Sequence, residues 1–264
     1  VMVVDCDSGG GSPVVSDDTG CEGSERDPIG PYWSSESYLP NPSAIAGSSG
    51  SHVYAVGYLG PVTHFDGTDW EIFANPFPFF TLFDVTVPEP NQVFAVGQLG
   101  VIAHFDGASW QSMASGTTES LRAVWGSSAS DVFAGGDGGM LLHFDGAHWT
   151  GMKGQVVGGV SDIWGSSSRD VSAIVNGPTG GTIMHYNGGD WVGMVDAPFH
   201  LWALWGASPN EVFAVGDDGS IFRYDGTWTS MEGTGSAQTL HSIWGSSATD
   251  VYALESWAII HYDG

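Results

Sequence analysis

Cationic side chains are scarce in this chain. Its 264 residues include only five lysines and arginines against 30 aspartates and glutamates, which gives a net charge of −25 at pH 7. Nucleic acids and anionic membrane surfaces bind proteins through clustered Lys and Arg and repel an acidic surface. The charge balance therefore argues against a partner that is a nucleic acid or an anionic membrane.

Long apolar runs are also missing. The sequence has no stretch of about eighteen consecutive apolar residues, so we expect no transmembrane helix. It shows no signal peptide and begins with Val1, and we therefore expect a processed or trimmed product. Cofactor-binding glycine motifs that open a helix are absent as well, and no cofactor is predicted.

Cysteine is nearly absent. Cys6 and Cys21 are the only two, and both lie in an acidic, Gly/Ser-rich leader that spans residues 1–29. A disulfide between them would close a small polar loop without a core of its own, which is typical of exported proteins. The alternatives are two free thiols, or a lipid on Cys6, which the poor cleavage site Val3-Val4-Asp5 disfavours. The sequence thus indicates an extracellular, periplasmic or cell-surface protein.

Glycine and tryptophan are plentiful, with 40 and 12 copies, and they belong to a repeat. A His-aromatic-Asp-Gly element recurs at intervals of 38 to 42 residues, the range of a propeller blade. The element begins at His64, His104, His143, His185, Arg223 and His261, with Asn187 in place of Asp in the fourth copy and Arg223 in place of His in the fifth.

Each copy contains four short apolar segments and no helical periodicity. In the third copy we expect strands A to D at Leu121–Trp125, Asp131–Gly136, Gly139–Phe144 and His148–Met152. Glycine-rich runs and Asp-Gly pairs between them favour tight turns, and Gly126-Ser127-Ser128 is predicted to be the turn between strands A and B. One four-stranded sheet leaves apolar faces open, whereas copies packed around an axis bury them.

The last copy stops at Gly264 before its outer strand. The missing Gly-x-x-Trp occurs at the other end of the chain, at residues 30–33, and the 234 residues from Gly30 to Gly264 divide into six repeats of 39. We therefore predict an all-β, six-bladed β-propeller over residues 30–264, with four-stranded antiparallel blades. An N-terminal strand around Trp33 is predicted to complete the last blade and remove its open edge.

The repeat Val-Gly-x-x-Gly-x-Ile-x-His-Tyr-Asp-Gly-x-x-Trp resembles the Asp-box repeats of bacterial neuraminidase-type propellers. It also resembles the tryptophan-rich repeats of secreted bacterial propeller proteins. The likeness covers residues 30–264. It departs from the usual Asp-box, which has Ser or Thr two residues before the Asp and one more residue before the Trp. The resemblance implies a propeller fold and raises the question of sialidase activity.

The repeated polar residues are interpreted as scaffold. His, Asp and Trp of each copy are expected to tie the C–D turn together by hydrogen bonds and packing, at points too far apart around a ring to share a metal ion. No metal site is predicted. The tryptophans expected to cement the blades are Trp33, Trp70, Trp110, Trp149, Trp191 and Trp228 on outer strands and Trp125, Trp164, Trp205 and Trp244 on inner ones.

Function is expected where the copies differ. One inner-strand position holds Ser43, Phe83, Arg122, Ser161, Trp202 and His241, whereas two residues later every copy has an apolar residue that is expected in the core: Ile45, Val85, Val124, Ile163, Leu204 and Ile243. The variable position should ring the mouth of the central channel, beside the equally variable D–A and B–C loops. Exposed aromatic residues there are typical contacts for proteins or sugars. The predicted binding residues are Tyr58, Phe77, Phe79, Phe80, Phe83, Arg122, Trp202, Asp217, Asp218, His241 and Trp257.

Sialidase, lectin and protein-binding functions place different demands on these residues. Sialidase chemistry, as the resemblance implies it, requires three arginines around one carboxylate. Arg122 is expected on one face, Arg169 and Arg223 on the opposite one, and Arg26 in the leader, so no catalytic residue is predicted. A multivalent lectin would repeat its binding residues in every blade. Because the expected contact residues differ, a non-enzymatic protein-binding or assembly module is preferred, with a glycan as the alternative ligand.

Overall fold

The computed structural model describes residues 41–74, 77–152, 157–231 and 237–264. The chain separates into two units, residues 1–36 and 37–264. The predicted disulfide Cys6–Cys21 and the predicted closing strand around Trp33 lie outside the described residues. Within these residues, no helix has the length and apolar character needed to cross a membrane.

The described residues of the second unit form six antiparallel sheets, each a meander of strands in sequence order. We label the strands of each sheet A to D. The first three sheets are β1 (Pro42–Ser49), β2 (His52–Gly57), β3 (Val62–Phe65) and β4 (Trp70–Ala74); β5 (Leu82–Glu89), β6 (Gln92–Gly97), β7 (Ile102–Phe105) and β8 (Trp110–Met113); and β9 (Leu121–Ser128), β10 (Asp131–Gly136), β11 (Leu141–Phe144) and β12 (Trp149–Gly151).

The remaining sheets differ in strand number. The fourth and fifth have four strands each, and the sixth has three. They are β13 (Gly159–Ser167), β14 (Asp170–Gly177), β15 (Gly180–Tyr186) and β16 (Trp191–Ala197); β17 (Leu201–Ser208), β18 (Glu211–Gly216), β19 (Ile221–Tyr224) and β20 (Trp228–Ser230); and β21 (Leu240–Ser247), β22 (Asp250–Glu255) and β23 (Ile259–Tyr262).

The predicted strands of the third copy are confirmed, with shifted ends. Gly126-Ser127-Ser128 is not a turn, contrary to the prediction: it continues β9, and Ser128 pairs with Asp131. A Cβ on Gly126 would lie 3.1 Å from both Pro88 and Val132, so this glycine allows close packing against the preceding sheet. Strand C begins at Leu141 because the residues before it form a short 3₁₀ turn, one of three: η1 (Gln98–Gly100), η2 (Asp137–Gly139) and η3 (Asp217–Gly219).

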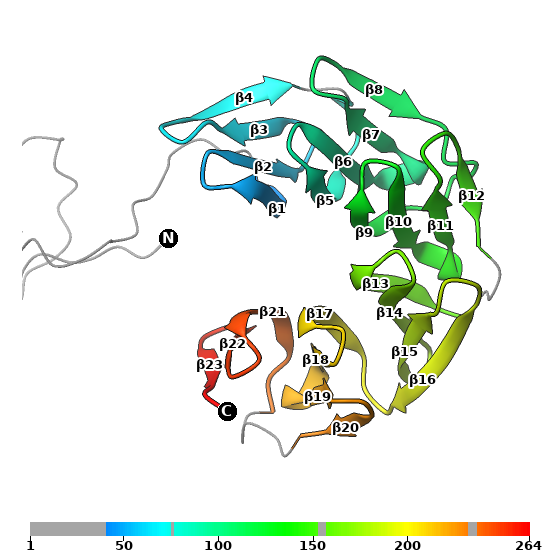
Figure 1. Cartoon of the computed structure of the whole chain (residues 1–264), viewed down its shortest axis with the longest axis vertical. Helices are drawn as coiled ribbons and strands as arrows, with labels where there is room; N and C mark the ends of the chain where they lie inside the picture. Colours follow the sequence, from blue (N-terminus) through cyan, green and yellow to red (C-terminus); the bar gives the residue numbers. More distant parts are fainter. Residues whose placement is uncertain (1–40, 75–76, 153–156, 232–236) are drawn as a thin grey trace, which may run out of the picture. The chain divides into compact units, whose positions relative to one another are not determined.

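The sheets follow one another in sequence order, with the A strands innermost (Figure 1). β1 packs against β5, β5 against β9, β9 against β13, β13 against β17, and β17 against β21. The main core clusters lie between neighbouring sheets, and they include the predicted Val85, Val124, Ile163, Leu204 and Ile243.

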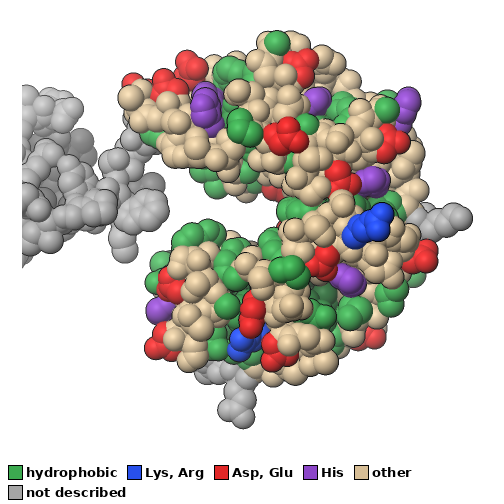
Figure 2. Space-filling model, viewed as in Figure 1, with side chains coloured by type: hydrophobic (Ala, Val, Ile, Leu, Met, Phe, Trp, Pro, Cys, Tyr) green, Lys and Arg blue, Asp and Glu red, His purple; other side chains and the backbone are tan. Residues whose placement is uncertain are grey.

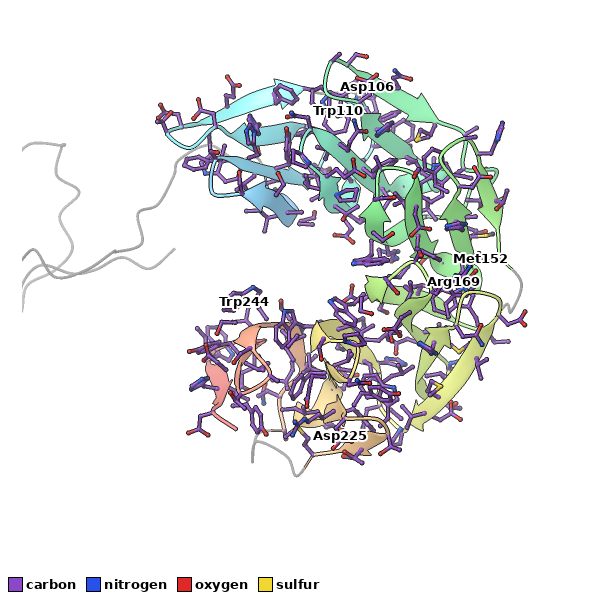
Figure 3. All side chains as sticks on the ribbon, viewed as in Figure 1. Asp106, Trp110, Met152, Arg169, Asp225 and Trp244 are labelled. Carbon is purple, nitrogen blue, oxygen red and sulfur yellow. The ribbon has the colours of Figure 1, made fainter. Side chains whose placement is uncertain are left out.

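Within the described residues, β21 and β1 do not pack against each other in the way that successive inner strands of the other sheets do. Ile45 on β1 is therefore 65% exposed. The prediction that Ile45 lies in the core is wrong within the described residues. Trp244 on β21 is 60% exposed for the same reason, and Figure 3 labels it on the last sheet, where no further sheet covers it.

The other inner tryptophans join neighbouring sheets, as predicted. A Cβ on Gly165 would lie 2.7 Å from the ring of Trp125, and one on Gly206 would lie 2.4 Å from that of Trp164. The ring of Trp205 meets Gly245 in the same way, at 2.6 Å. Each indole therefore packs closely against the glycine that follows the next sheet's own tryptophan, and any side chain there would displace it.

Outer tryptophans also bridge sheets. Trp149 Nε1 donates to Met113 Sδ of the preceding sheet at 3.5 Å, and Trp191 Nε1 donates to Met152 Sδ at 3.2 Å. Trp110 and Met152 are labelled with their sheets in Figure 3. Packing of these rings against the core of the preceding sheet confirms their structural role.

The role predicted for the repeated histidine is wrong. His143 does not tie the C–D turn: its Nε2 lies 2.7 Å from Oδ1 of Asp131, the first residue of strand B. The histidine points across to the neighbouring strand, whereas Asp145 lies in the turn itself. Asp145 Oδ1 accepts the backbone N–H groups of Ala147 and His148 at 2.9 and 2.8 Å, as predicted for the aspartate.

Candidate interaction surface

The variable inner-strand position lies beside the B–C turns, as the sequence indicated. We call this end of the sheets, which carries the B–C turns and the D–A loops, the mouth face. The opposite end carries the A–B and C–D turns. Figure 2 shows this opposite end, with carboxylates spread over it and few Lys or Arg side chains. Figure 3 labels Arg169 and Asp225 at the same end.

Arg122 is already engaged within the protein. Its Nε donates to Asp137 Oδ1 at 2.7 Å and its second guanidinium nitrogen to Oδ2 at 3.1 Å, a two-point contact with the B–C turn of its own sheet. The guanidinium also lies 4.8 Å from the centre of the Phe83 ring of the preceding sheet. The Asp137 carboxylate raises the pKa of Arg122 further. The positive charge of Arg122 is therefore already paired with a carboxylate of the protein and is not free to bind a ligand.

Trp202 is held in a similar way. Its Nε1 donates to Asp217 Oδ1 at 2.8 Å, and Thr239 Oγ1 donates to the same oxygen at 2.9 Å. The ring of His200 stands edge-on to the indole at 5.9 Å. These bonds orient a side chain that is still 39% exposed, so Trp202 presents a fixed aromatic surface at the mouth.

A groove runs beside this tryptophan along the D–A loop and the B–C turn of the fifth sheet. Its lining includes Pro198, Phe199, His200, Asp217, Asp218 and Thr239, and no Lys or Arg is among the residues around it. The groove thus combines ring and carboxylate surfaces.

The remaining predicted residues fall into two groups. Trp257, Phe79 and Tyr58 are 93%, 82% and 55% exposed, whereas Phe77 packs against the core between the first two sheets and its ring meets that of Phe80 at 6.5 Å. His241 Nε2 lies 3.5 Å from Ser256 Oγ on the B–C turn of the sixth sheet. The exposed aromatic residues are available for contact, and the Phe77–Phe80 pair shapes the loop that presents Phe79.

Two carboxylates that the sequence analysis missed lie between inner strands. Asp84 Oδ1 accepts the N–H of Val85 and its Oδ2 accepts the N–H of Val124 on the next sheet, both at 2.8 Å. Burial raises the pKa of Asp84 to about 6 against the opposing effect of these hydrogen bonds. The sequence contains one signal for these carboxylates, because small residues and Asp alternate at one aligned inner-strand position: Ala44, Asp84, Ala123, Asp162, Ala203 and Ser242.

Asp162 repeats this arrangement two sheets later. It accepts the N–H groups of Ile163 at 2.8 Å and of Leu204 at 2.7 Å. Burial, assisted by the charge of Asp84, raises its pKa to about 7, again against the backbone hydrogen bonds. Every second sheet junction in this part of the molecule therefore contains a carboxylate that bridges two inner strands.

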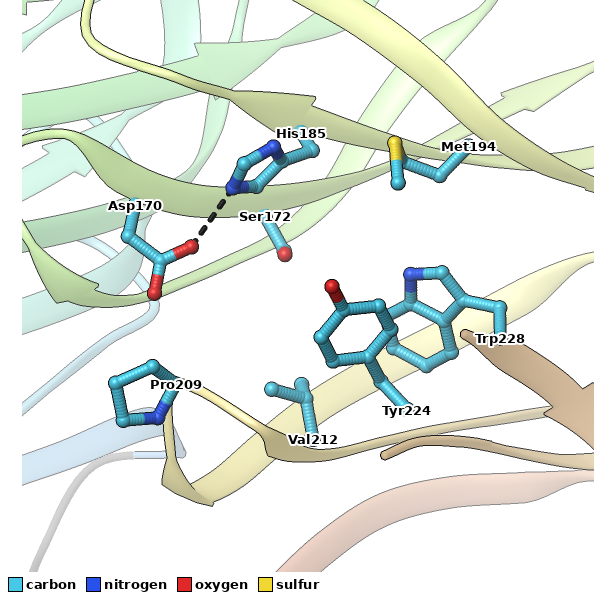
Figure 4. Close-up of a pocket in the computed structure, with 8 residues that line it drawn as sticks. All are labelled: Asp170, Ser172, His185, Met194, Pro209, Val212, Tyr224 and Trp228. Atoms are coloured by element: carbon cyan, nitrogen blue, oxygen red, sulfur yellow. Dashed lines mark hydrogen bonds and ion pairs between the residues drawn. The ribbon is translucent and has the colours of Figure 1, made fainter. Parts of the chain in front are cut away.

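The fourth sheet departs from the others next to its histidine. Five sheets place an aromatic residue beside the strand-C His or Arg, and the fourth has Ser172, which leaves a cavity of about 20 Å³, room for about one water. Figure 4 shows Ser172 facing this cavity with Tyr224, while Asp170 Oδ1 contacts His185 Nε2 at 2.7 Å. Within the described residues no hydrogen bond joins Ser172 to the imidazole. The same His–Asp contact occurs in the third and sixth sheets, where Phe133 and Tyr252 take the place of Ser172, so it has a structural explanation.

No three His, Cys, Asp or Glu side chains of the described residues come together in a way that would hold a metal ion.

Comparisons with known proteins identify the fold. No family model and no curated protein matches the sequence. Among solved structures, the chain is similar to virginiamycin B lyase from Staphylococcus aureus, with a TM-score of 0.71 and 12% identity over 85% of this chain and 84% of that one. The Myceliophteria thermophila Cps50 (Swd1) β-propeller domain gives 0.66 and 12% over 85% and 83%.

A third similar structure is described as YCF48 bound to D1 peptide, with a TM-score of 0.55 and 13% identity over 85% of this chain and 92% of that one. At such identities these likenesses bear on architecture alone. Together with six successive antiparallel sheets whose A strands are innermost, they show that the described residues have a β-propeller fold, and the six sheets fit six blades.

Proposed function

We propose that this propeller is a binding module that holds a polypeptide partner on its mouth face. The observation that carries the proposal is the set of oriented or exposed rings there: Trp202 fixed by Asp217, Trp257 at 93% exposure and Phe79 at 82%. Large aromatic residues dominate the energetics of protein interfaces, and water-exposed rings bring no folding benefit to their own chain. The residues around the mouth differ from sheet to sheet, which suits a single asymmetric partner better than repeated sugar sites.

The similar structures support this proposal by analogy. YCF48, which has a related fold, is described with a bound peptide. Arg122, a mouth cation that could have met a sugar carboxylate, is bonded to Asp137. The proposed role requires no catalytic group. An exported location belongs to the same proposal and rests on the two leader cysteines in the sequence.

We also propose that residues around Trp33 complete the sixth blade. The support is that this blade has three strands among the described residues, and that Ile259 on β23 is 69% exposed. An added strand would satisfy the free edge of β23 and reduce its tendency to pair with other chains.

The test is capture by the immobilised full chain from the protein's native surface fraction and medium, run beside a glycan array. Three forms are compared: wild type, Trp257→Ala and Val192→Ala. Val192 is a matched control, since it is 47% exposed on the outer strand β16, away from the mouth. We expect a protein retained by wild type and Val192→Ala and lost with Trp257→Ala. Equal retention by all three, or glycan binding without a retained protein, would contradict the proposal.

A further inference from the structure

The tips of four B–C turns share a left-handed residue. Leu59, Leu99 and Asp218 have φ values of 62°, 53° and 56°, and Gly138 occupies the equivalent place in the third sheet with φ of 69°. A residue with a Cβ is disfavoured in this conformation, whereas glycine adopts it freely. Because the third sheet folds with glycine there, the turn itself does not require leucine or aspartate. Leu59, Leu99 and Asp218 therefore occupy this conformation at a local cost in free energy, which makes them candidates for function.

The two leucines belong to an apolar part of the mouth face. Leu59 and Leu99 are 45% and 62% exposed, and Phe79 is the most exposed ring of the loop between their sheets. That loop is tied to the second turn, since Thr81 N–H donates to Gln98 Oε1 at 2.9 Å and Gln98 N–H donates to Thr81 O at 3.0 Å. The mouth end of the first two sheets therefore exposes four large apolar side chains, Tyr58, Leu59, Phe79 and Leu99, on a chain that is otherwise strongly acidic.

The fifth sheet presents the opposite chemistry at the same place. Asp218 is exposed at its tip and makes no hydrogen bond or ion pair within the described residues, and Asp217 lies beside it in the groove. Arg122, the cation at the mouth, already contacts Asp137 at 2.7 Å. The uncompensated charge of this part of the mouth face is therefore negative, in line with the net charge of −25.

We infer that the turn tips select the partner: a polypeptide segment with apolar side chains for the first two sheets and a Lys or Arg for the groove at Asp217 and Asp218. This inference rests on the proposed function and specifies its partner. Charge complementarity disfavours an acidic segment, because no free cation of the described mouth residues would meet it. The apolar side chains of the partner would bury Leu59 and Leu99, which are exposed to water, and this burial favours binding.

The test uses three short fluorescent peptides and measures fluorescence anisotropy with the full chain. The first has a Leu/Phe half and a Lys/Arg half, the second replaces Lys/Arg by Glu, and the third replaces Leu/Phe by Ser. We expect the first to bind about tenfold or more tightly than either of the others, a difference of about 1.4 kcal/mol. Its affinity should fall with added salt, because exposed charges are screened.

Glycine variants separate contact from folding. Leu59→Gly with Leu99→Gly should keep or raise the melting temperature, since glycine suits φ near 60°, yet weaken the first peptide about tenfold. Asp218→Gly should reduce the salt dependence of its binding. Gly138 provides the precedent that the turn accepts glycine, and Val192→Ala is the control for a change away from the mouth.

The inference is overturned if the Glu peptide binds as well as the Lys/Arg peptide, if none of the three binds, or if the glycine variants bind unchanged. The capture experiment is independent of these peptides. A partner lost with Trp257→Ala but insensitive to Leu59→Gly, Leu99→Gly and Asp218→Gly would retain the proposed function and refute only this partner chemistry.

Discussion

Arg223 and Glu211 form a two-point ion pair in the fifth sheet, with nitrogen–oxygen distances of 2.8 to 3.1 Å. In the third sheet the equivalent positions are His143 and Asp131, which lie 2.7 Å apart. Both members of the pair differ between the two sheets, and the longer Arg meets the longer Glu. The fifth sheet is the one copy without the repeated histidine. It still has a contact between strands B and C, because Arg and Glu together take the places of His and Asp.

This pair can be tested by removing and exchanging its members. Glu211→Ala leaves the half-buried Arg223 guanidinium with its carboxylate partner missing, and we expect the free energy of unfolding to fall by about 1–3 kcal/mol. Arg223→His combined with Glu211→Asp recreates the third-sheet pair and should recover most of this loss. Urea unfolding of the three forms measures it. A double variant no more stable than Glu211→Ala would show that the pairs are not equivalent.

Stability should depend on pH through Asp84 and Asp162. Their folded-state pKa values, about 6 and about 7, lie above the ordinary aspartate value of 3.8. Between these limits the folded state binds more protons than the unfolded state, so their contribution is complete below pH 3.8 and is lost as pH rises through about 6 to 7. We expect the melting temperature of the wild type to fall over this range.

The matched control replaces both residues by alanine, which Ala123 and Ala203 show to be accepted at this position in other sheets. The difference in melting temperature between wild type and Asp84→Ala/Asp162→Ala should change between pH 5 and pH 8. A constant difference would show that these carboxylates do not titrate there. The turn aspartates Asp66 and Asp106 act in the opposite sense, because hydrogen bonds lower their pKa values and their stabilisation is lost only in acid.

Trp149 should matter for stability and not for binding. It is 8% exposed, and its indole donates to Met113 Sδ across a sheet junction. Truncation to alanine leaves a large cavity there, and we expect a loss of about 3–5 kcal/mol in the free energy of unfolding. Partner affinity, measured below the melting transition, should be unchanged. Loss of affinity in a fully folded Trp149→Ala protein would place the partner on the outer strands.

Deletion of residues 1–36 tests the proposed closing strand. Without it the edge of β23 would stay free, with Ile259 exposed, and we expect aggregation or loss of a single cooperative melting transition. Size-exclusion chromatography with calorimetry measures both. A monomeric truncation that melts as the parent does would show that another segment, or none, closes the ring.

The sequence predicted the sheets well because turns and apolar alternation are local signals. It placed Asp145 in its turn correctly, since an Asp-Gly turn is closed by its own neighbours. The partner of His143 was missed because Asp131 lies on another strand, and only strand register brings the two together. Gly126 was misjudged as a turn residue because its need for glycine arises from Pro88 of another sheet. Asp84 and Asp162 were overlooked since their partners are backbone N–H groups, which leave no trace in the sequence.

The most direct measurement is site-specific photo-crosslinking from the mouth face and from the opposite face. A photoreactive phenylalanine analogue is placed at Phe79, at Trp257 and, as the control, at Arg169 on the opposite face. We expect positions 79 and 257 to crosslink the captured polypeptide and position 169 to give no crosslink. Crosslinking from position 169 alone would show that the partner binds the other end of the sheets and would contradict the mouth face as the site of binding.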